Sequence, residues 1–420
     1  MRPRLNPLDS DHVRDQLAQR TVVANRVRTQ PEGEFVLYWM QSTHRFEENW
    51  ALRQAVLHAD RLGKPLLVHQ GLDPTYAHAS DRIHRVVDRL AERAALVVTD
   101  RFPTAGIAER TARFAARAPC RVDAVESHGI IASGHFVKEE YAARTIRPKI
   151  AKVLDLALEV DRLDLDRADL AAEIAACEID HTVPAVPFSS GLAGARARLA
   201  QFCAHTLPDY AERRNEPSDT EGSSRLSPYL HFGQISAAEV LRTVRATGHA
   251  ESAKKFEDEL VTWRELALNF CLMNPDHGKL KGLPDWVHRT MEAHRDDDRE
   301  AIYSREQLEG ARTHDELWNA AQRELVRTGF LHNVTRMLWG KSVLLWTRRY
   351  QHALEHLIHL NDKYALDGRD PSSYGGIQWC FGKFDRPWFD KPVWGVIRPM
   401  SLARAREKFD ADAYMSSFPA

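Results

Sequence analysis

The first third of the chain alternates short apolar runs with helical patterns, and this alternation ends near Lys149. The apolar runs are FVLYWM (35–40), PLLVHQ (65–70), AALVVTD (94–100) and RVDAV (121–125). Helical patterns such as NWALRQAVLHADRLG separate them. Strands that alternate with helices predict a doubly wound parallel sheet. No GxGxxG follows any of these runs, so a dinucleotide bound in the usual βαβ manner is not supported.

Beyond Lys149 the strand signals nearly vanish, and the remaining sequence is mostly helical. The helical segments are AGARARLAQFCAHTLPDYAE, SAAEVLRTVRAT, SAKKFEDELVTWRELALNFCLM, THDELWNAAQRELVRTG and HNVTRMLWGKSVLLWTRRYQHALEHLIHL. A chain of 420 residues is also too long for a single core. We therefore predict an α/β domain over residues 1–160, a linker over 161–190 that contains the proline-rich VPAVPFSSG, and an all-α domain over 191–420.

The composition is that of an ordinary globular protein, with 43% hydrophobic and 28% charged residues. The net charge is −1, so any nucleic-acid-binding surface has to be a local patch. Five cysteines without CxxC spacing argue against a zinc site and against a disulfide framework. The sequence has neither an apolar run of membrane length nor a signal-peptide core. We expect a cytoplasmic protein, associated with the nucleoid if the source is prokaryotic, that binds no metal.

A loop of small hydroxyl residues, GSSRLSPYLHFGQIS, precedes one of the predicted helices. Its Ser223, Ser224 and Ser227 can offer hydroxyl and backbone N–H groups to a phosphate at the helix N-terminus. The alternative is an ordinary N-cap, with Ser227 placed directly before a proline. Upstream, DYAERRNEP adds Tyr210 and Arg214, which are either contacts to a phosphate or flavin or part of a solvated surface helix.

Two further patterns combine aromatic and polar residues on helices. Glu259 and Trp263 are four residues apart and therefore share a helix face, which suits a flat ligand with hydrogen-bonding edges. A core tryptophan beside a surface ion pair explains that pair equally well. Trp339 and Trp346 are two helical turns apart, roughly 10 Å along one face, and Trp318 lies on the preceding helix. Three such indoles can form an electron-transfer chain, although aromatic residues at helical spacing are more often ordinary core.

The stretch LNDKYALDGRDPSSYGGIQW (360–379) follows an apolar helix and carries aspartates, an asparagine, a Gly-Gly pair and a tryptophan. A plain helix end needs one capping residue and one turn residue. The excess of polar groups predicts that this stretch holds a partner with many hydrogen-bonding edges.

Together and in this order, these stretches resemble the DNA photolyase/cryptochrome flavoprotein family, and most closely its class II cyclobutane pyrimidine dimer photolyases. The motifs that carry the resemblance are YWMQSTHRFEENWAL, KEEYAARTIRPKI, SRLSPYLHFGQIS, LWNAAQRELVRTGFLHNVTRMLWGKSVLLW and LNDKYALDGRDP followed by GGIQW. The resemblance runs from about Phe35 to Phe409. It implies a monomer in which the all-α domain binds FAD, with reduced FADH⁻ as the active form.

The resemblance also implies which residues bind the flavin. Asn361 matches the asparagine that faces flavin N5 in class II enzymes and favours the reduced anionic form. The other matching positions, around the flavin and its pyrophosphate, are Tyr210, Arg214, Ser223, Ser224, Leu226, Ser227, Asp367 and Asp370. Trp318, Trp339 and Trp346 match the tryptophan chain that photoreduces the flavin.

The implied substrate is DNA that contains a cyclobutane pyrimidine dimer, with the dimer flipped out of the duplex. Glu259 matches the glutamate that hydrogen-bonds the dimer, and Trp263 and Trp379 match the aromatic pair that packs against it. Arg386, Trp388 and Arg398 match positions of the hairpin that enters the DNA. Excited FADH⁻ passes an electron to the dimer, the ring opens, and the electron returns.

Two other functions remain open. A cryptochrome-like photoreceptor would keep FAD without repairing DNA, and it would be favoured by a long carboxyl-terminal extension, whereas this sequence stops soon after FDADAYMSSFPA. A degenerate flavin- or DNA-binding protein is the other alternative. Asn333 after His332 argues against repair of (6-4) photoproducts, which requires a reactive histidine pair.

The α/β domain departs from the family between DRIHR and VVDRLAERAALVVTD. It is shorter there by about one strand and one helix, the size of a βα unit. That domain houses the antenna chromophore in relatives, so we do not expect 8-hydroxydeazaflavin or a folate to bind.

Overall fold

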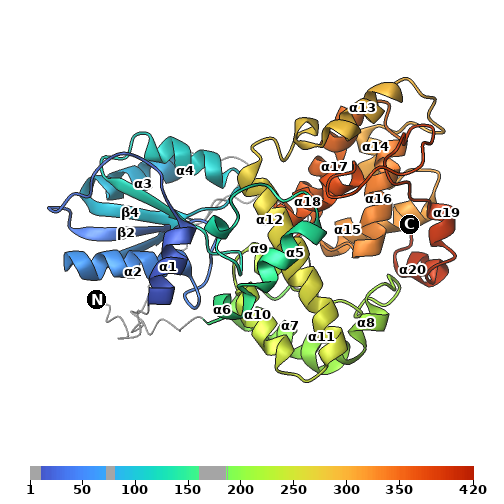
Figure 1. Ribbon diagram of the computed structural model, residues 1–420. Coiled ribbons are helices and arrows are strands. Elements are labelled where there is room, and N and C mark those ends of the chain that lie inside the picture. The colour runs from blue at the N-terminus through green and yellow to red at the C-terminus, as the bar shows by residue number, and fades with distance from the viewer. Residues whose placement is uncertain (1–10, 72–80, 160–185, 187) are drawn as a thin grey trace. The chain divides into compact units, whose positions relative to one another are not determined.

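The structure, a computed structural model, describes residues 11–71, 81–159, 186 and 188–420 (Figure 1). The chain divides into two compact units. Unit 1 comprises Met1–Val137, Lys149–Thr182 and Tyr229–Arg242, and unit 2 comprises Lys138–Pro148, Val183–Pro228 and Thr243–Ala420. Most of the predicted linker, residues 160–185 and 187, lies outside the described residues.

Unit 1 is built on a five-stranded sheet of order β1-β5-β4-β2-β3. Its strands are β1 (Thr21–Val23), β2 (Phe35–Met40), β3 (Leu66–Gln70), β4 (Ala94–Asp100) and β5 (Arg121–Val125). The last four match the four predicted strands and pair in parallel. β1 was not predicted, and it pairs antiparallel with β5 at the edge of an otherwise parallel sheet. Three residues are too few to show a strand period in the sequence.

Helices cover both faces of the sheet (Figure 1). They are α1 (Asp11–Arg20), α2 (Trp50–Leu62), α3 (Asp81–Arg93) and α4 (Ile107–Ala115). Because side chains alternate along a strand, Val36, Tyr38 and Met40 of β2 pack with α2 in one core. Leu37 and Trp39 point the other way, into a second core with Phe114 of α4 and Val87 of α3. Helices on both faces of a mostly parallel sheet confirm the doubly wound α/β class.

The predicted loss of a βα unit falls between β3 and β4, within the residues that α3 occupies. α3 ends at Arg93 and β4 begins at the next residue, Ala94. Among the described strands, β3 is the edge strand beside β2. No residue of β3 is fully buried, whereas every residue of β2 is. The loss of one strand beyond β3 would produce this edge.

Unit 2 is helical, as predicted. Its described helices, together with those at the borders of unit 1, are α5 (Ala143–Ala151), α6 (Leu154–Ala157), α7 (Gly191–Gln201), α8 (Tyr210–Arg213), α9 (Ser227–His231), α10 (Ala237–Arg245), α11 (Ala250–Glu257), α12 (Arg264–Met273), α13 (Asp285–Ala293), α14 (Arg305–Glu309), α15 (Glu316–Thr328), α16 (Asn333–Leu345), α17 (Tyr350–Tyr364), α18 (Pro371–Cys380), α19 (Leu402–Ala405) and α20 (Ala411–Ser417). None of the helices in the described ranges is long and apolar enough to cross a membrane.

Three long predicted helices are interrupted. The one predicted over residues 193–212 breaks between α7 and α8, where the chain contains Pro208. The other two breaks are as follows. A π-helical segment, Asp258–Trp263, separates α11 from α12. The predicted helix from 332 to 360 breaks after Leu345, and α17 begins only at Tyr350. Neither break contains a glycine or proline, so the sequence carried no signal for either.

The core of unit 2 lies among α15, α16, α17 and α18. α18 also packs closely on α12, where a Cβ atom on Gly375 would lie 2.9 Å from Cβ of Ala267. Half of the Gly-Gly pair of the sequence is therefore explained by helix packing alone.

Candidate functional site

The hydroxyl loop before α9 is held from behind by Arg198 of α7. Its guanidinium donates to the backbone carbonyls of Ser223, at 3.0 Å, and Ser224, at 2.8 Å. Arg225 has a left-handed backbone conformation, with φ of 52°. Leu226 is 1% exposed, so only its backbone is left for a ligand. Ser223 and Ser224 remain half-buried, with their carbonyl groups already bonded to Arg198.

Ser227 is the first residue of α9, so the predicted start of a helix at this position is confirmed. A helix start and a ligand contact are compatible, because the first backbone N–H groups of a helix have no partner within it. The structure therefore leaves both interpretations of this serine in place.

Arg214 joins two predicted groups of residues. Its Nη1 lies 2.6 Å from Oε1 of Glu259, and its guanidinium lies 5.7 Å from the ring centroid of Tyr210. Tyr210 is not on a solvated surface: its ring packs against Phe202 and Phe256, and burial raises its pKa to about 12. The Arg214 side chain is 9% exposed, and its Nε has no hydrogen-bond partner among the described residues.

Glu259 and Trp263 lie in the π-helical segment rather than in a regular α-helix. Such segments have i→i+5 hydrogen bonds and occur frequently at functional sites. Both residues remain half-buried, whereas Leu260, Val261 and Thr262 between them are buried. The two residues therefore border the less buried side of the segment, as their spacing predicted, although the regular helix predicted there is wrong.

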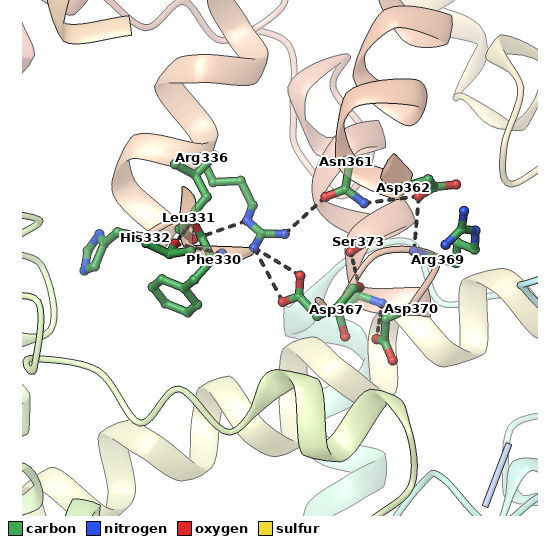
Figure 2. A network of polar contacts seen from close by, with 12 residues as sticks. Phe330, Leu331, His332, Arg336, Asn361, Asp362, Asp367, Arg369, Asp370 and Ser373 are labelled. Carbon is green, nitrogen blue, oxygen red and sulfur yellow. Dashed lines mark hydrogen bonds and ion pairs between the residues drawn. The ribbon is translucent and has the colours of Figure 1, made fainter. Parts of the chain in front are cut away.

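Polar residues at the end of α17 and in the turn before α18 form a network centred on Arg336 of α16 (Figure 2). Arg336 donates to Oδ1 of Asn361 at 3.3 Å and to the carboxylate of Asp367 at 3.2 Å. The Asn361 amide donates onward to Asp362 at 3.2 Å. Asn361 is buried and Asp367 is half-buried. Arg336 thus holds in place Asn361 and Asp367, two of the residues that the resemblance assigned to the flavin.

The remaining acidic groups of this stretch shape the turn itself. Asp370 caps α18 by accepting the backbone N–H of Ser372 at 2.8 Å. Asp362 accepts the backbone N–H of Arg369 at 3.1 Å, and Arg369 has φ of 66°. Burial raises the pKa of Asp362. Part of the polar excess that predicted a ligand therefore serves helix capping and turn closure.

Trp318, Trp339 and Trp346, called here the stacked tryptophans, lie in contact and are almost fully buried. Trp318 and Trp339 stack with ring centroids 6.4 Å apart and planes within 8°, and Trp318 meets Trp346 at 5.8 Å. Trp318 therefore lies between the other two. This order differs from the predicted stacking of Trp339 and Trp346 along one helix, because α16 ends at Leu345 and Trp346 is its C-cap.

Trp379, Trp388 and Trp394, called here the cation-covered tryptophans, each have a basic side chain over the ring. Arg398 lies 5.7 Å from the ring centroid of Trp379 and 4.3 Å from that of Trp388. Lys341 lies 4.9 Å from Trp379 and 5.5 Å from Trp394. The distance from Arg386 to Trp388 is 5.2 Å. The structure thus brings the predicted hairpin residues Arg386, Trp388 and Arg398 together with Trp379.

His332 is held in a neutral form by its surroundings. Burial lowers its pKa to about 4, and its Nε2 lies 3.1 Å from the carbonyl oxygen of Arg214. Its Nδ1 accepts the backbone N–H of Val334 and so caps α16. A neutral capping histidine is a poor proton donor at neutral pH.

The residue set fits a flavin nucleotide. Arg214 and Arg225 have buried Nε atoms without a partner in the described part of the chain, and such atoms suit an anionic or hydrogen-bonding ligand. The analysis of the sequence missed Arg198, Arg336 and Lys341. Arg198 and Arg336 lie on helices where a basic residue normally faces solvent, so only their partners in the fold reveal their positions.

Comparison with known proteins gives long matches. The chain is 35% identical to the deoxyribodipyrimidine photo-lyase of Methanothermobacter thermautotrophicus, over 91% of this chain and 94% of the relative. It is 36% identical to the enzyme of that name from Oryza sativa, over 91% and 87%. It is 32% identical to that from Potorous tridactylus, over 93% and 82%. The alignment with the archaeal protein spans 425 positions, more than the 420 residues of this chain, so it includes segments that this chain lacks.

Solved structures share the fold. A class III photolyase from Agrobacterium tumefaciens matches with a TM-score of 0.64 and 18% identity, over 94% of this chain and 88% of that one. A cryptochrome from Synechocystis matches with a TM-score of 0.68 and 15% identity, over 91% and 88%. No protein-family model matches the sequence.

Proposed function

The chain belongs to the deoxyribodipyrimidine photo-lyase family, and from this premise we propose that it repairs cyclobutane pyrimidine dimers in DNA, in light, as class II photolyases do. The observation that carries the proposal is the match to photo-lyases over nine-tenths of the chain, at 32–36% identity. The geometry adds that the assigned residues gather into connected groups within unit 2.

The cofactor of the proposal is FAD, which when bound in its reduced form supplies the electron that opens the cyclobutane ring. Ser223, Ser224, Ser227 and the backbone of Leu226 would hold its pyrophosphate, through hydroxyl and N–H groups. Arg198 supports this role because it engages the carbonyls of Ser223 and Ser224 and thereby fixes the loop.

Arg214, Asn361 and Asp367 would line the flavin ring system, with Tyr210 as a buried wall. The Arg336 guanidinium fixes the orientation of Asn361 and Asp367, because it donates to both side chains. Asp370 would act indirectly, through the start of α18, rather than as a flavin ligand.

The substrate would lie against Glu259, Trp263 and Trp379. A flipped-out dimer presents flat faces and hydrogen-bonding edges, which aromatic rings and a carboxylate recognise. Arg214 fixes the orientation of the Glu259 carboxylate through their ion pair at 2.6 Å. Arg386 and Arg398, beside Trp388, would contact DNA phosphates or fill the gap that the flipped-out dimer leaves in the duplex.

The stacked tryptophans would carry electrons from the protein surface to the flavin during photoreduction. Their burial in the core of unit 2 also agrees with an ordinary structural role, so contact alone does not decide the matter. What favours electron transfer is the unbroken contact order Trp339–Trp318–Trp346.

The proposal also covers the oligomeric state and the antenna chromophore. We propose a monomer that requires no protein partner. We also propose that the segment lost relative to the relatives is the βα unit after β3 and that unit 1 binds no antenna chromophore.

The test is light-dependent repair by the purified full-length protein. Its flavin is reduced, UV-irradiated oligo(dT) is added, and the ultraviolet absorbance that dimers lack is followed under blue light and in the dark. Recovery only under illumination supports repair. A yellow protein without recovery would instead favour the cryptochrome-like photoreceptor, and a colourless protein would contradict the flavin assignment.

A further inference from the structure

Unit 2 holds two sets of tryptophans that differ in their electrostatic surroundings. The stacked tryptophans have neutral hydrogen-bond acceptors, and the cation-covered tryptophans have basic side chains over their rings. Trp339 of the stacked set and Lys341, which covers two of the other set, are two residues apart on α16. Trp339 and Trp394 belong to the same core cluster, and Trp379 packs against it, so an electron vacancy on Trp339 has tryptophans of both sets in its surroundings.

Lys341 is an unusual lysine. It is 0% exposed, and its Nζ has no hydrogen-bond acceptor in the described ranges. Its partners are the faces of Trp379 and Trp394, at 4.9 and 5.5 Å. Burying an ammonium group without an acceptor is costly, and the attraction of the two ring faces offsets only part of that cost.

Arg398 and Arg386 extend the positive charge to Trp388. Arg398 is fixed by a bidentate bond to Asp385, with distances of 2.6 and 2.9 Å. Asp385 is itself half-buried, so the charge of Arg398 is partly balanced, whereas that of Lys341 has no directly bonded counterion.

The stacked tryptophans have neutral oxygen acceptors instead. The Trp318 indole N–H donates to the backbone carbonyl of Trp339 at 3.0 Å, and the Trp339 indole N–H donates to Oε1 of Gln322 at 2.9 Å. Within the described chain, no lysine or arginine lies over any of these three rings. His314 contacts the outer ring, Trp346, at 5.0 Å, and its Nδ1 is bonded to the hydroxyl of Tyr303 at 2.6 Å.

We propose that Lys341, with Arg398, prevents oxidation of the tryptophans in the substrate pocket and so directs the electron vacancy along the stacked tryptophans. An indole that loses an electron becomes a radical cation, and forming it beside a fixed positive charge costs additional Coulomb energy. A hydrogen bond from the indole N–H to a neutral oxygen has the opposite effect, because it stabilises the radical cation.

The electron balance is simple. One electron passes from Trp318 to oxidised Trp339, and one from Trp346 to oxidised Trp318, with no bond made or broken. The competing step, from Trp379 to oxidised Trp339, would place a radical cation next to the Lys341 ammonium group. Lys341 is thus a positioning residue for charge, and it contacts neither the flavin nor the substrate in this proposal.

The inference rests on the proposed function for the source of the vacancy in the cell, but its test does not. Azide radicals generated by pulse radiolysis in the dark remove one electron from tryptophan without light or flavin chemistry. The oxidised tryptophans of the full-length protein are then located by mass spectrometry of peptides. The measured quantity is oxidation at Trp379 and Trp394 relative to oxidation at Trp346.

In the wild type this ratio is expected to be low, although Trp379 is more exposed than Trp346. Lys341→Met has a similar volume and removes only the charge, and it should raise the ratio by about tenfold, the scale of a desolvated cation–π contact. Lys341→Arg keeps the charge and should retain the low ratio. A Met variant with the wild-type ratio would overturn the proposal, even if repair is observed.

A measurement on the wild type covers the case in which the Met variant does not fold. Burial lowers the pKa of Lys341 to about 8, so its charge is lost as the pH rises through that value. The groups that face it keep their charge state around pH 8: burial raises the pKa of Cys380 to about 11, the bond from Arg398 lowers the pKa of Asp385 despite burial, and Asp385 raises the pKa of Arg398.

The oxidation ratio should therefore rise between pH 7 and pH 9, with a midpoint of about 8, and should stay flat in Lys341→Arg. A flat profile in the wild type would overturn the inference. Because the oxidant is external, absence of repair would leave this result intact, and the two failures can be told apart.

Discussion

The stacked tryptophans and the cation-covered tryptophans share one helical unit but differ in almost every contact. The stacked set is fully buried, ring against ring, with neutral oxygen acceptors. The cation-covered set is partly open and lies under Lys341, Arg386 and Arg398. The same residue type is thus suited to carry charge in one place and to pack against a ligand near phosphates in the other.

The largest effect on repair is expected from Glu259, the carboxylate that we propose to bind the dimer. Glu259→Gln keeps the shape but removes the charge that pairs with Arg214. We expect the rate of dimer repair to fall by roughly tenfold to a hundredfold, the loss for one charged hydrogen bond. Flavin content and photoreduction should remain near wild type, as measured by absorbance.

The matched control is Glu257→Gln, two residues before Glu259 in the sequence, which removes the ion pair between Glu257 and Arg245. It should leave repair unchanged. Loss of flavin in Glu259→Gln would show that this carboxylate supports the flavin side through Arg214, and the separation of the two regions would fail.

A smaller effect, on the affinity for FAD, is expected from Arg336. Arg336→Met removes the bonds to both Asn361 and Asp367. Flavin affinity should fall by about tenfold, because the buried Asn361 and the half-buried Asp367 lose their fixed orientation. Equilibrium dialysis of FAD measures this, with exposed Arg327→Met as the control. Equal affinity in both variants would remove Arg336 from the account.

The smallest effect on repair is expected at Glu324, where a substitution changes protein stability around the stacked tryptophans. Burial raises the pKa of Glu324, on the same helix as Trp318, to about 7 from its ordinary 4.5. The folded protein then holds a proton that the unfolded chain has lost, so stability decreases as the pH rises from about 4.5 to 7.

Glu324→Gln should abolish that part of the pH dependence and stabilise the protein at pH 8, by at most roughly 3 kcal/mol. Urea unfolding at pH 5 and pH 8 is the measurement, and Glu407→Gln at an exposed site is the control. An unchanged pH dependence in Glu324→Gln would mean that water reaches this side of α15.

Sequence patterns predicted which segments form strands and helices better than they predicted where helices break and how the edge strand pairs. The four parallel strands were predictable because each is a short apolar run rich in β-branched residues. The antiparallel β1, the π-helical segment at Glu259 and the break before α17 were not predictable, because each depends on tertiary contacts rather than on a local breaker.

The candidate site shows the same division. Trp318, Trp339 and Trp346 were identified, but their order was not, since Trp318 reaches its position only when α15 packs on α16. Lys341 was missed because a lysine within a helix normally faces solvent. Some of the acidic groups in residues 360–379 also have structural partners that the sequence did not reveal, since Asp362 accepts the backbone N–H of Arg369 and Asp370 accepts that of Ser372.

The separation of the two tryptophan sets is tested most directly by two variants and two rates. Trp318→Phe and Trp379→Ala are each assayed for flavin photoreduction and, after chemical reduction, for dimer repair. We expect Trp318→Phe to lose most photoreduction while repair persists, and Trp379→Ala to lose about tenfold in repair, the scale of one stacking contact, while photoreduction persists. If either variant lost both activities equally, the two sets would not have separate roles and the account would be wrong.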